Sequence, residues 1–405
     1  MDIVNKQVKI YKYYFSFPTL LWFLLAAIAV TLELSRGLDS VNNYLIYKGV
    51  FQHTLQQKHL YIQYPAEYDD ANHYGPLFSM VIAPFAMLNN YVGCFLWCLA
   101  NATLLYFAIK NLPITRHQKN VALLITAVEM MTSTHSVQFN PMLTSWILLA
   151  FILIEKEQDI WATLFIVAGF YVKLYGIVGL AFFLFSKHKI KFIVSFIFWL
   201  IVLFCLPMLI SSPTFIVQSY QHWVQSLIAK NVQNTDSSIA MNLQDLSVLG
   251  MVRRIFKIEN LHNYFITVPA AIMLLLPYLR IKQYKYLHYR LSYLALLLIS
   301  VVIFSTSAES PTYVIAVTGV ALWFIVQPLP TTKLVYMLLV FAIIVTTFSV
   351  TDIFPHWVRV NFFIAYALKA LPCFCIWLVL LFQLLFKKYQ LNLVPSTVSI
   401  KEGYQ

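Results

Sequence analysis

Glycine and charged residues are both scarce in this chain. Its 405 residues include 10 glycines, and 11% of the residues are charged. So low a charged fraction excludes an ordinary soluble domain. Transporters and channels use glycine where helices touch or break. The scarcity of glycine therefore weakens a transporter interpretation, and we find no clear internal repeat that would favour one.

The chain also lacks the usual signatures of metal and nucleotide sites. Its five cysteines all lie in apolar runs without disulfide or zinc spacing, which is typical of buried thiols. There is no glycine-rich phosphate loop. A divalent ion held by Asp39 with Asp69 or Asp70 has little support from the spacing. We expect neither a metal nor another cofactor.

Hydrophobic residues make up 60% of the chain, and the mean hydropathy is +0.73. About 20 apolar residues are needed for one spanning helix, and lipid-exposed backbone must satisfy its own hydrogen bonds. The sequence therefore predicts an all-α transmembrane bundle of about 11–13 spans, with residues 1–405 as a single domain. The run at 18–35 is too long for a signal-peptide core, so we expect it to be retained as the first span.

The formal charge of +12 does not require a nucleic-acid partner, because basic residues gather in the cytoplasmic loops of membrane proteins. If the N-terminus is cytoplasmic and each apolar run crosses once, 18 of the 28 lysines and arginines fall on the inner side. The C-terminus is then also cytoplasmic, and we expect the chain in the cell's inner (plasma) membrane, with the active site on the outer or periplasmic face. The outer segments are 36–75, 134–140, 173–175, 211–262, 305–312 and 350–360.

Two apolar runs do not fit one straight span each. The run 76–109 contains Pro84, and we expect a surface or half-depth helix at 76–88 before the crossing. The run 160–186 is either one long helix or a shallow pair that turns inside the membrane. Basic residues at 187–191 favour the shallow pair, which would place Lys173 at its apex. We also expect juxtamembrane helices in the first outer loop, 36–75, and in the long outer loop, 211–262.

Several polar residues on the outer face could form a substrate site. Asp39 is a candidate general base, although it could instead cap a helix or pair with Arg36. Lys173 suits a phosphate, but it could also extend to the interface. The pair Arg253 and Arg254 could bind phosphate or lipid headgroups.

Other candidates on this face also have structural alternatives. Asn140 could bind sugar hydroxyls together with Gln138, or cap the helix that follows. Glu309 lies in a loop too short to project far into water, which favours a place in the site. The amides and aromatic residues of 211–262 suit a carbohydrate, or an amphipathic cover on the outer leaflet.

Several different short motifs follow one another in a defined order along residues 15–260. Asp39 after the first span is followed by Tyr44 and Gly49, and a Tyr74-Gly75-Pro76-Leu77 element begins the second span. Further along come Val137-Gln138-Phe139-Asn140, then Gly169 to Gly176 with Lys173 between them, and a stretch from Asn242 to Arg254. Taken together, these motifs resemble the GT-C integral-membrane glycosyltransferases, and most closely family 87, which includes polyprenyl-phosphate-mannose-dependent α-mannosyltransferases.

The chain departs from the family pattern at several positions. Gly75 replaces the first proline of the second-span motif, Val137 replaces a glycine, and Gly176 replaces a proline. A histidine that family members often carry near Glu309 is missing. These departures indicate a divergent branch with a different sugar or acceptor.

The resemblance implies transfer of a sugar, with mannose favoured, from a polyprenyl-phosphate-linked donor to a glycolipid or glycan acceptor on the outer face. It implies inversion in a single displacement, with Asp39 as the base and Lys173, Arg253 and Arg254 on the donor phosphate. We expect a monomer without a cofactor or nucleic acid. The residues predicted to bind sugar or acceptor are Tyr44, Tyr74, Gln138, Asn140, Tyr175, Asn242 and Glu309.

Other classes of membrane protein stay open at this stage. A lipid-linked polysaccharide polymerase or ligase also pairs many spans with one long outer loop, but it usually relies on arginines in that loop. A flippase would show repeats, more glycine and charges at mid-span. A third alternative is an inactive scaffold, and in that case mutation of Asp39 would not change what the chain does.

Overall fold

The computed structural model describes residues 3–235, 245–258 and 261–389. It confirms the predicted all-α class, because helices account for most of the chain. The sequence analysis did not foresee the strands β1 (Gln7–Ile10) and β2 (Tyr13–Ser16), which pair antiparallel just before the first helix.

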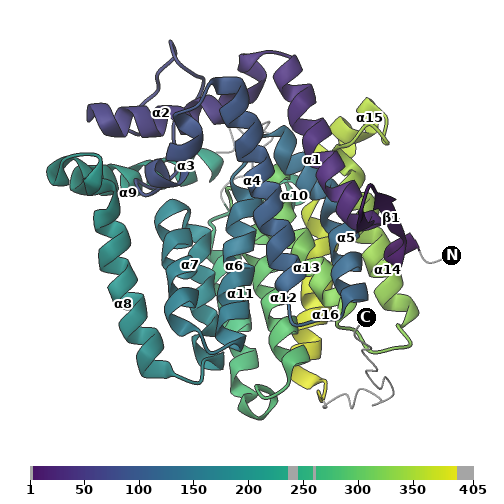
Figure 1. The fold of residues 1–405 in the computed structure, drawn as a ribbon. Helices are drawn as coiled ribbons and strands as arrows, with labels where there is room; N and C mark the ends of the chain where they lie inside the picture. The colour runs from purple at the N-terminus through teal and green to yellow at the C-terminus, as the bar shows by residue number, and fades with distance from the viewer. Residues whose placement is uncertain (1–2, 236–244, 259–260, 390–405) are drawn as a thin grey trace.

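Most helices run roughly parallel in a bundle (Figure 1). Among the described residues, four helical segments are long and apolar enough to cross a membrane, namely Phe17–Ser35, Asn90–Asn111, Lys189–Leu209 and Lys333–Val350. Seven shorter apolar helices of 10–17 residues accompany them. The bundle consists of α1 (Phe17–Ser35), α4 (Asn90–Asn111), α5 (Arg116–His135), α6 (Asn140–Glu155), α7 (Asp159–Val172), η3 (Leu174–Phe185), α8 (Lys189–Cys205), α11 (Tyr264–Leu275), α12 (Leu287–Ile303), α13 (Tyr313–Ile325), α14 (Lys333–Phe341) and α16 (Ala370–Phe386).

Short helical turns extend or connect these helices. They are η1 (Ile3–Asn5), η2 (Leu38–Val41), η4 (Leu206–Leu209), η6 (Leu276–Leu279), η7 (Ile281–Gln283), η8 (Ser310–Thr312), η9 (Ala342–Thr347), η10 (Phe348–Val350), α15 (His356–Val358) and η11 (Arg359–Ile364).

Further helices lie at one end of the bundle. Helices α2 (Asn42–Gln56) and α9 (Pro213–Thr235) run across this end in Figure 1, with α3 (Phe78–Ala86) beside them. Helix α10 (Val248–Phe256) follows α9 in the chain. Helices α2, α9 and α10 correspond to those predicted in the first and the long middle outer loops, and α3 corresponds to the separate helix predicted at 76–88.

Both irregular apolar runs divide as the sequence predicted. The run 76–109 splits into α3 and α4, and the Asn89 side chain caps α4 by accepting a hydrogen bond from the Tyr91 amide at 3.0 Å. The run 160–186 splits into α7 and η3, with Lys173 in extended backbone at the break. The fold therefore agrees with a helix pair that breaks at Lys173 and not with one long helix, while the depth of this pair in the membrane stays a prediction.

Glycine permits the close approach of α7 and η3. A Cβ atom at Gly176 would lie 2.3 Å from the carbonyl carbon of Gly169, and one at Gly169 would lie 2.9 Å from the Cα of Gly176. Gly75 packs against the same turn, where a Cβ would lie 2.0 Å from the Tyr171 carbonyl oxygen. The Gly75 amide donates to the Val172 carbonyl at 3.0 Å. Three of the few glycines thus hold together the turn that carries Lys173.

A cluster of aromatic rings supports the same end of the bundle from below. Phe78 packs edge-on against Trp97 and Phe139, with ring centroids 5.8 and 5.7 Å apart. Tyr47 and Tyr74 stand on Phe78 at centroid distances of 4.9 and 4.7 Å. Edge-to-face and stacked contacts of this kind add to the stability that burial provides. They tie α2, α3, α4 and the start of α6 into one rigid unit.

We predict that Gly176→Ala destabilises the fold by about 1–3 kcal/mol, because the new methyl group would overlap backbone that cannot rotate away. The loss would appear as a lower thermal unfolding midpoint of the purified protein in detergent. Gly179→Ala on the same element is the control. Its Cβ would meet Cγ1 of Ile166 at 2.6 Å, and that side chain can shift. Equal midpoints for the two variants would contradict the crossing as the constraint.

Candidate active site

A cavity of about 710 Å³ opens at the end of the bundle where α2 and α9 lie. Each of the outer segments predicted from the charge pattern contributes residues to its lining. The structure thus brings together chain segments up to about 300 residues apart, as the topology predicted. The polar and aromatic lining includes Asn43, Tyr47, Asp70, His73, Tyr74, Ser136, Gln138, Lys173, Tyr175, Trp223, Lys230, Asn231, Asn234, Ser305, Glu309 and Thr312.

Lys173 projects from the α7–η3 turn into this cavity. Its Nζ donates a hydrogen bond of 2.8 Å to Oδ1 of Asn140, and it lies 5.0 Å from the ring centroid of Tyr175 and 5.8 Å from that of Tyr74. Cation–π contacts at these distances stabilise an ammonium group that has lost part of its hydration. Burial lowers the pKa of Lys173 to about 8, and the charge of Glu309 opposes the shift.

Asn140 is fully buried at the start of α6, where it connects three parts of the cavity wall. Its Nδ2 donates to the Pro311 carbonyl at 3.2 Å, while its Oδ1 accepts from Lys173. The same amide lies 3.4 Å from Oε1 of Gln138, which accepts a 3.3 Å hydrogen bond from the Tyr74 hydroxyl. With its amide directed into this network, Asn140 orients Lys173, and capping of α6 does not explain it, because no side-chain cap bond forms there.

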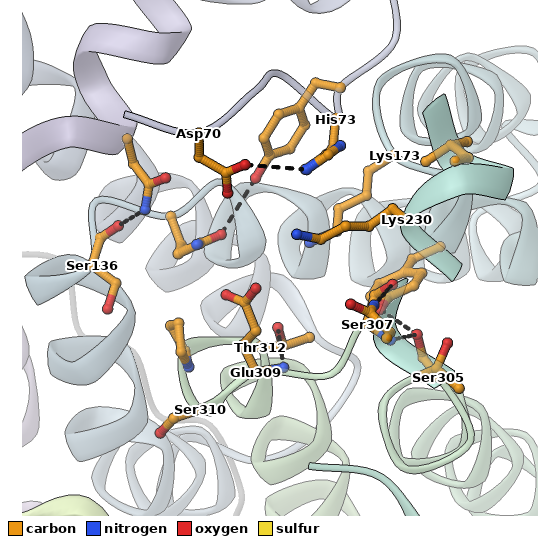
Figure 2. A pocket seen from close by; sticks show the side chains of 18 of the residues that line it. Asp70, His73, Ser136, Lys173, Lys230, Ser305, Ser307, Glu309, Ser310 and Thr312 are labelled. Atoms are coloured by element: carbon orange, nitrogen blue, oxygen red, sulfur yellow. Dashed lines mark hydrogen bonds and ion pairs between the residues drawn. The ribbon is translucent and has the colours of Figure 1, made fainter. Parts of the chain in front are cut away.

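Glu309 lies in the α12–α13 connection and is half-buried. Figure 2 shows its carboxylate pointing across the cavity toward Asp70, with Lys173 and Lys230 reaching in from one side. Burial raises the pKa of Glu309 above 4.5, and the charges of Lys173 and Lys230 act against that rise. A carboxyl group in this environment is suited to accept a proton from a substrate hydroxyl.

The opposite wall comes from the first outer loop. Asn43 on α2 donates from Nδ2 to the Ser136 carbonyl at 2.7 Å, and the hydroxyls of Tyr47 and Tyr74 lie 3.1 Å apart. Asp70 is exposed at the mouth, 4.0 Å from Nε2 of His73. Residues between 43 and 74 thus form one wall of the cavity.

His73 joins the first loop to α9. Its carbonyl accepts a 3.0 Å hydrogen bond from Nε1 of Trp223, and its Nδ1 lies 3.4 Å from Oγ of Ser226. Burial lowers the pKa of His73 to about 4, and the charge of Lys230 adds to this shift. The imidazole is therefore neutral at pH 7 and leaves the two lysines as the cations of the cavity.

Most of the residues predicted to bind sugar or acceptor line the cavity. Tyr175 also contacts the wall, where its hydroxyl lies 2.6 Å from Oγ of Ser305. The predicted residues that line the cavity are Tyr74, Gln138, Lys173, Tyr175 and Glu309. Asn140 lies behind this lining and contacts it through its hydrogen bond with Lys173.

The structure does not bring Asp39 to the cavity. It lies on η2, its side chain is exposed, and it is absent from the lining residues. Asn43, one turn further along, reaches the cavity in its place. The acid that pairs with Arg36 is Glu33, at 3.0 Å, so Asp39 does not form that predicted alternative contact. The catalytic role of Asp39 stays a prediction.

Tyr44 and the two arginines also lie away from the cavity lining. The Tyr44 hydroxyl donates to the Phe85 carbonyl at 2.8 Å, which fits α2 against α3. The guanidinium of Arg253 binds the Leu261 carbonyl and lies 3.8 Å from Asp245, while Nη1 of Arg254 donates to the Ile364 carbonyl at 2.7 Å. These contacts hold the α10 region in place. Asn242 lies outside the described residues.

Asn43, His73 and Lys230 were not predicted from the sequence as site residues, and Asp70 received little weight. Helical spacing could have placed Lys230 on the inner face of α9, because it follows Trp223 by two turns. Among the residues that the structure describes, no group of three His, Cys, Asp or Glu side chains could hold a metal ion.

A comparison with protein families matches residues 72–306 to glycosyltransferase family 87. A search of curated proteins found no match. The family match spans more than half of the chain, and it includes Tyr74, Gln138, Asn140, Lys173 and Lys230. A helical membrane bundle whose matched region supplies most of a cavity rich in amides, aromatic rings and charges is what such an enzyme requires. The chain belongs to glycosyltransferase family 87, and it is a glycosyltransferase of the membrane.

Proposed function

We propose that the chain transfers a sugar, with mannose favoured, from a polyprenyl-phosphate-linked donor to a hydroxyl group of a glycolipid or glycan on the outer face of the membrane. The observation that carries this proposal is the presence of Lys173 and Glu309 in one cavity without a salt bridge between them. An ammonium group and a carboxylate kept apart can act on opposite sides of a reacting carbon.

In the proposed step, the acceptor oxygen forms a bond to the anomeric carbon as the bond from that carbon to the phosphate oxygen breaks. The acceptor proton passes to a carboxylate, and the electron pair of the broken bond stays with the lipid phosphate. Lys173 stabilises the phosphate, as an ammonium group does in a site of low dielectric constant. Attack from the face opposite the leaving group inverts the anomeric configuration.

We propose Glu309 as the base in place of Asp39. The family pattern favours Asp39, but its carboxylate is exposed and outside the cavity lining. Glu309 faces the cavity, and burial raises its pKa in the direction that makes it a stronger base. The amide and hydroxyl groups of Gln138, Tyr74 and Tyr175 then surround the sugar between the two charges.

The alternative of a polysaccharide polymerase receives less support from the site. Arginines of the outer loop would carry that chemistry, whereas Arg253 and Arg254 hydrogen-bond backbone carbonyls and are absent from the cavity lining. The same contacts argue against Arg253 and Arg254 as ligands of the donor phosphate.

The basic test is sugar transfer by the purified chain in detergent. With polyprenyl-phosphate mannose and a glycolipid extract, we expect a mannosylated product and free polyprenyl phosphate, both detected by mass spectrometry. A flippase needs a sealed membrane, so lipid movement in vesicles without any conversion in detergent would contradict the transferase proposal. A heat-inactivated sample controls for chemical breakdown of the donor.

We expect Glu309→Gln to lower kcat by about 10²–10⁴-fold, the usual contribution of a general base, while the thermal midpoint stays close to that of the unmodified chain. Asp39→Asn is the matched comparison, and we expect it to retain activity. The decisive measurement is the initial rate of transfer at saturating donor. Loss of activity in Asp39→Asn with retention in Glu309→Gln would return the base role to Asp39.

We expect a bell-shaped dependence of kcat/KM on pH. Activity falls at low pH as Glu309 takes up a proton, at a pH above the ordinary range because its pKa is raised. It falls again above a pH of about 8 as Lys173 loses its proton. Lys173→Met should remove the alkaline limb and lower the rate throughout. An alkaline limb that persists in Lys173→Met would exclude Lys173 as its source.

A further inference from the structure

Lys230 is a second cation in the cavity that has no assigned partner. It lies on α9, it is half-buried, and its side chain is part of the cavity lining. Among the residues that the structure describes, none forms a hydrogen bond or ion pair with it. Lys173 differs in this respect, since Asn140 accepts its hydrogen bond at 2.8 Å. An unpaired, partly desolvated ammonium group is unfavourable unless an anion neutralises it.

The acids of the cavity do not provide that anion. Glu309 feels the charge of Lys230, which acts against the rise in its pKa, but the two side chains form no salt bridge. Asp70 is exposed, and its Oδ1 accepts a hydrogen bond from the Ala71 amide at 2.8 Å. His73, the nearest ring, is neutral at pH 7 because burial lowers its pKa to about 4.

Helix α9 holds Lys230 in a fixed position. Ile216, Tyr220 and Trp223 are buried on one face of the helix and pack against Tyr171 and neighbouring side chains. The residues one and two turns further on this face, Leu227 and Lys230, line the cavity with Asn231 and Asn234. The Thr306 hydroxyl donates to Oδ1 of Asn231 at 2.9 Å, which fastens this part of α9 to the α12–α13 loop.

A second face of α9, about a third of a turn away from the buried one, carries an exposed apolar stripe. Val217, Val224, Ile228 and Val232 are each more than 40% exposed and follow one another at intervals of four or seven residues. A helix that lies across the end of a membrane bundle with such a stripe fits the boundary between headgroups and hydrocarbon (Figure 1). Lys230 then stands at the depth of a lipid phosphate, on the cavity side of the helix.

The charge of that phosphate changes during the proposed reaction. In the donor it is a diester with one negative charge. When the bond to the anomeric carbon breaks, the electron pair stays on the phosphate oxygen, and the product is a monoester with a second pKa near 6 that carries up to two negative charges. A cation that binds the product phosphate better than the donor phosphate accelerates the step, because it stabilises charge that develops in the transition state.

We propose that Lys230 is a second phosphate ligand that neutralises the negative charge gained by the departing polyprenyl phosphate, while Lys173 holds the charge already present in the donor. This inference rests on the proposed function and adds a division of roles between two cations. Figure 2 shows both lysines reaching in from the same side of the cavity, as a shared phosphate requires.

The test compares Lys230→Met with the unmodified chain in steady-state kinetics with polyprenyl-phosphate mannose. We expect kcat to fall by about 10–100-fold, while the KM for the donor changes by less than about threefold. Lys230→Arg should restore most of the rate. Lys58→Met, which removes an exposed cation of the first loop away from the cavity, is the control for net charge.

A binding measurement supplies a readout that does not depend on turnover. At pH 8, where the phosphate monoester is a dianion, Lys230→Met should weaken inhibition by free polyprenyl phosphate by about tenfold, and it should weaken donor binding much less. A larger KM at unchanged kcat would overturn the proposal, because it would mean that Lys230 binds donor and transition state equally. Recovery of the rate on adding anionic phospholipid would also overturn it, since Lys230 would then contact bulk headgroups.

The two levels of proposal fail in different ways. If Lys230→Met behaves like the unmodified chain while Glu309→Gln and Lys173→Met lose activity, the role of Lys230 is wrong and the transferase site stands. If the cavity variants all transfer sugar at the unmodified rate, the site itself is wrong.

Discussion

The site depends on keeping one ammonium group charged in a place that is largely closed to water. Lys173 stands at a break between two apolar helices, where burial alone would favour its neutral form. Its charged form is stabilised by the side-chain amide oxygen of Asn140, two aromatic rings and the charge of Glu309. These partners come from α6, the first outer loop, η3 and the α12–α13 loop, so the packing of the whole upper end is organised around a single charge.

Glycine occupies the positions near Lys173 where the packing leaves no room for a side chain. Gly169, Gly176 and Gly75 meet backbone atoms at distances that exclude a side chain, and all of them adjoin the Lys173 turn. At two of these positions the chain departs from the family pattern, with Gly75 and Gly176 in place of proline. The ring of a proline restricts its own backbone dihedral angle φ, whereas the backbone of a glycine has to be held in place by neighbouring residues. The rigid aromatic cluster around Phe78 provides that support from the other side.

Much of this architecture was predictable because hydropathy and the distribution of lysine and arginine report directly on the membrane. They grouped the segments that meet at the cavity, and they predicted the helix break that carries Lys173. The motif pattern identified the family. What could not be predicted depends on rotation within single turns. The backbone path from η2 into α2 decides whether Asp39 or Asn43 faces the cavity. The sequence does not show this path, because both residues are polar and either could face inward. Lys230 shares a helix face with Trp223, two turns earlier, but only the docking of Trp223 and Tyr220 shows that this face of α9 turns inward.

The separation of charges in the cavity explains why both acids and both lysines are retained without neutralising one another. If Glu309 paired directly with Lys173 or Lys230, its proton affinity would fall and the lysine would be unavailable to phosphate. Because the groups are kept apart, the proposed substrates could interact with each of them: a hydroxyl proton with the acid, and a phosphate with the lysines. The raised pKa of Glu309 and the lowered pKa of Lys173 both reflect the burial of a charge that its neighbours neutralise only in part. In the proposed reaction, the phosphate of a bound donor would lie beside the lysines, offset their opposing field at Glu309 and so make Glu309 a better base when the acceptor arrives.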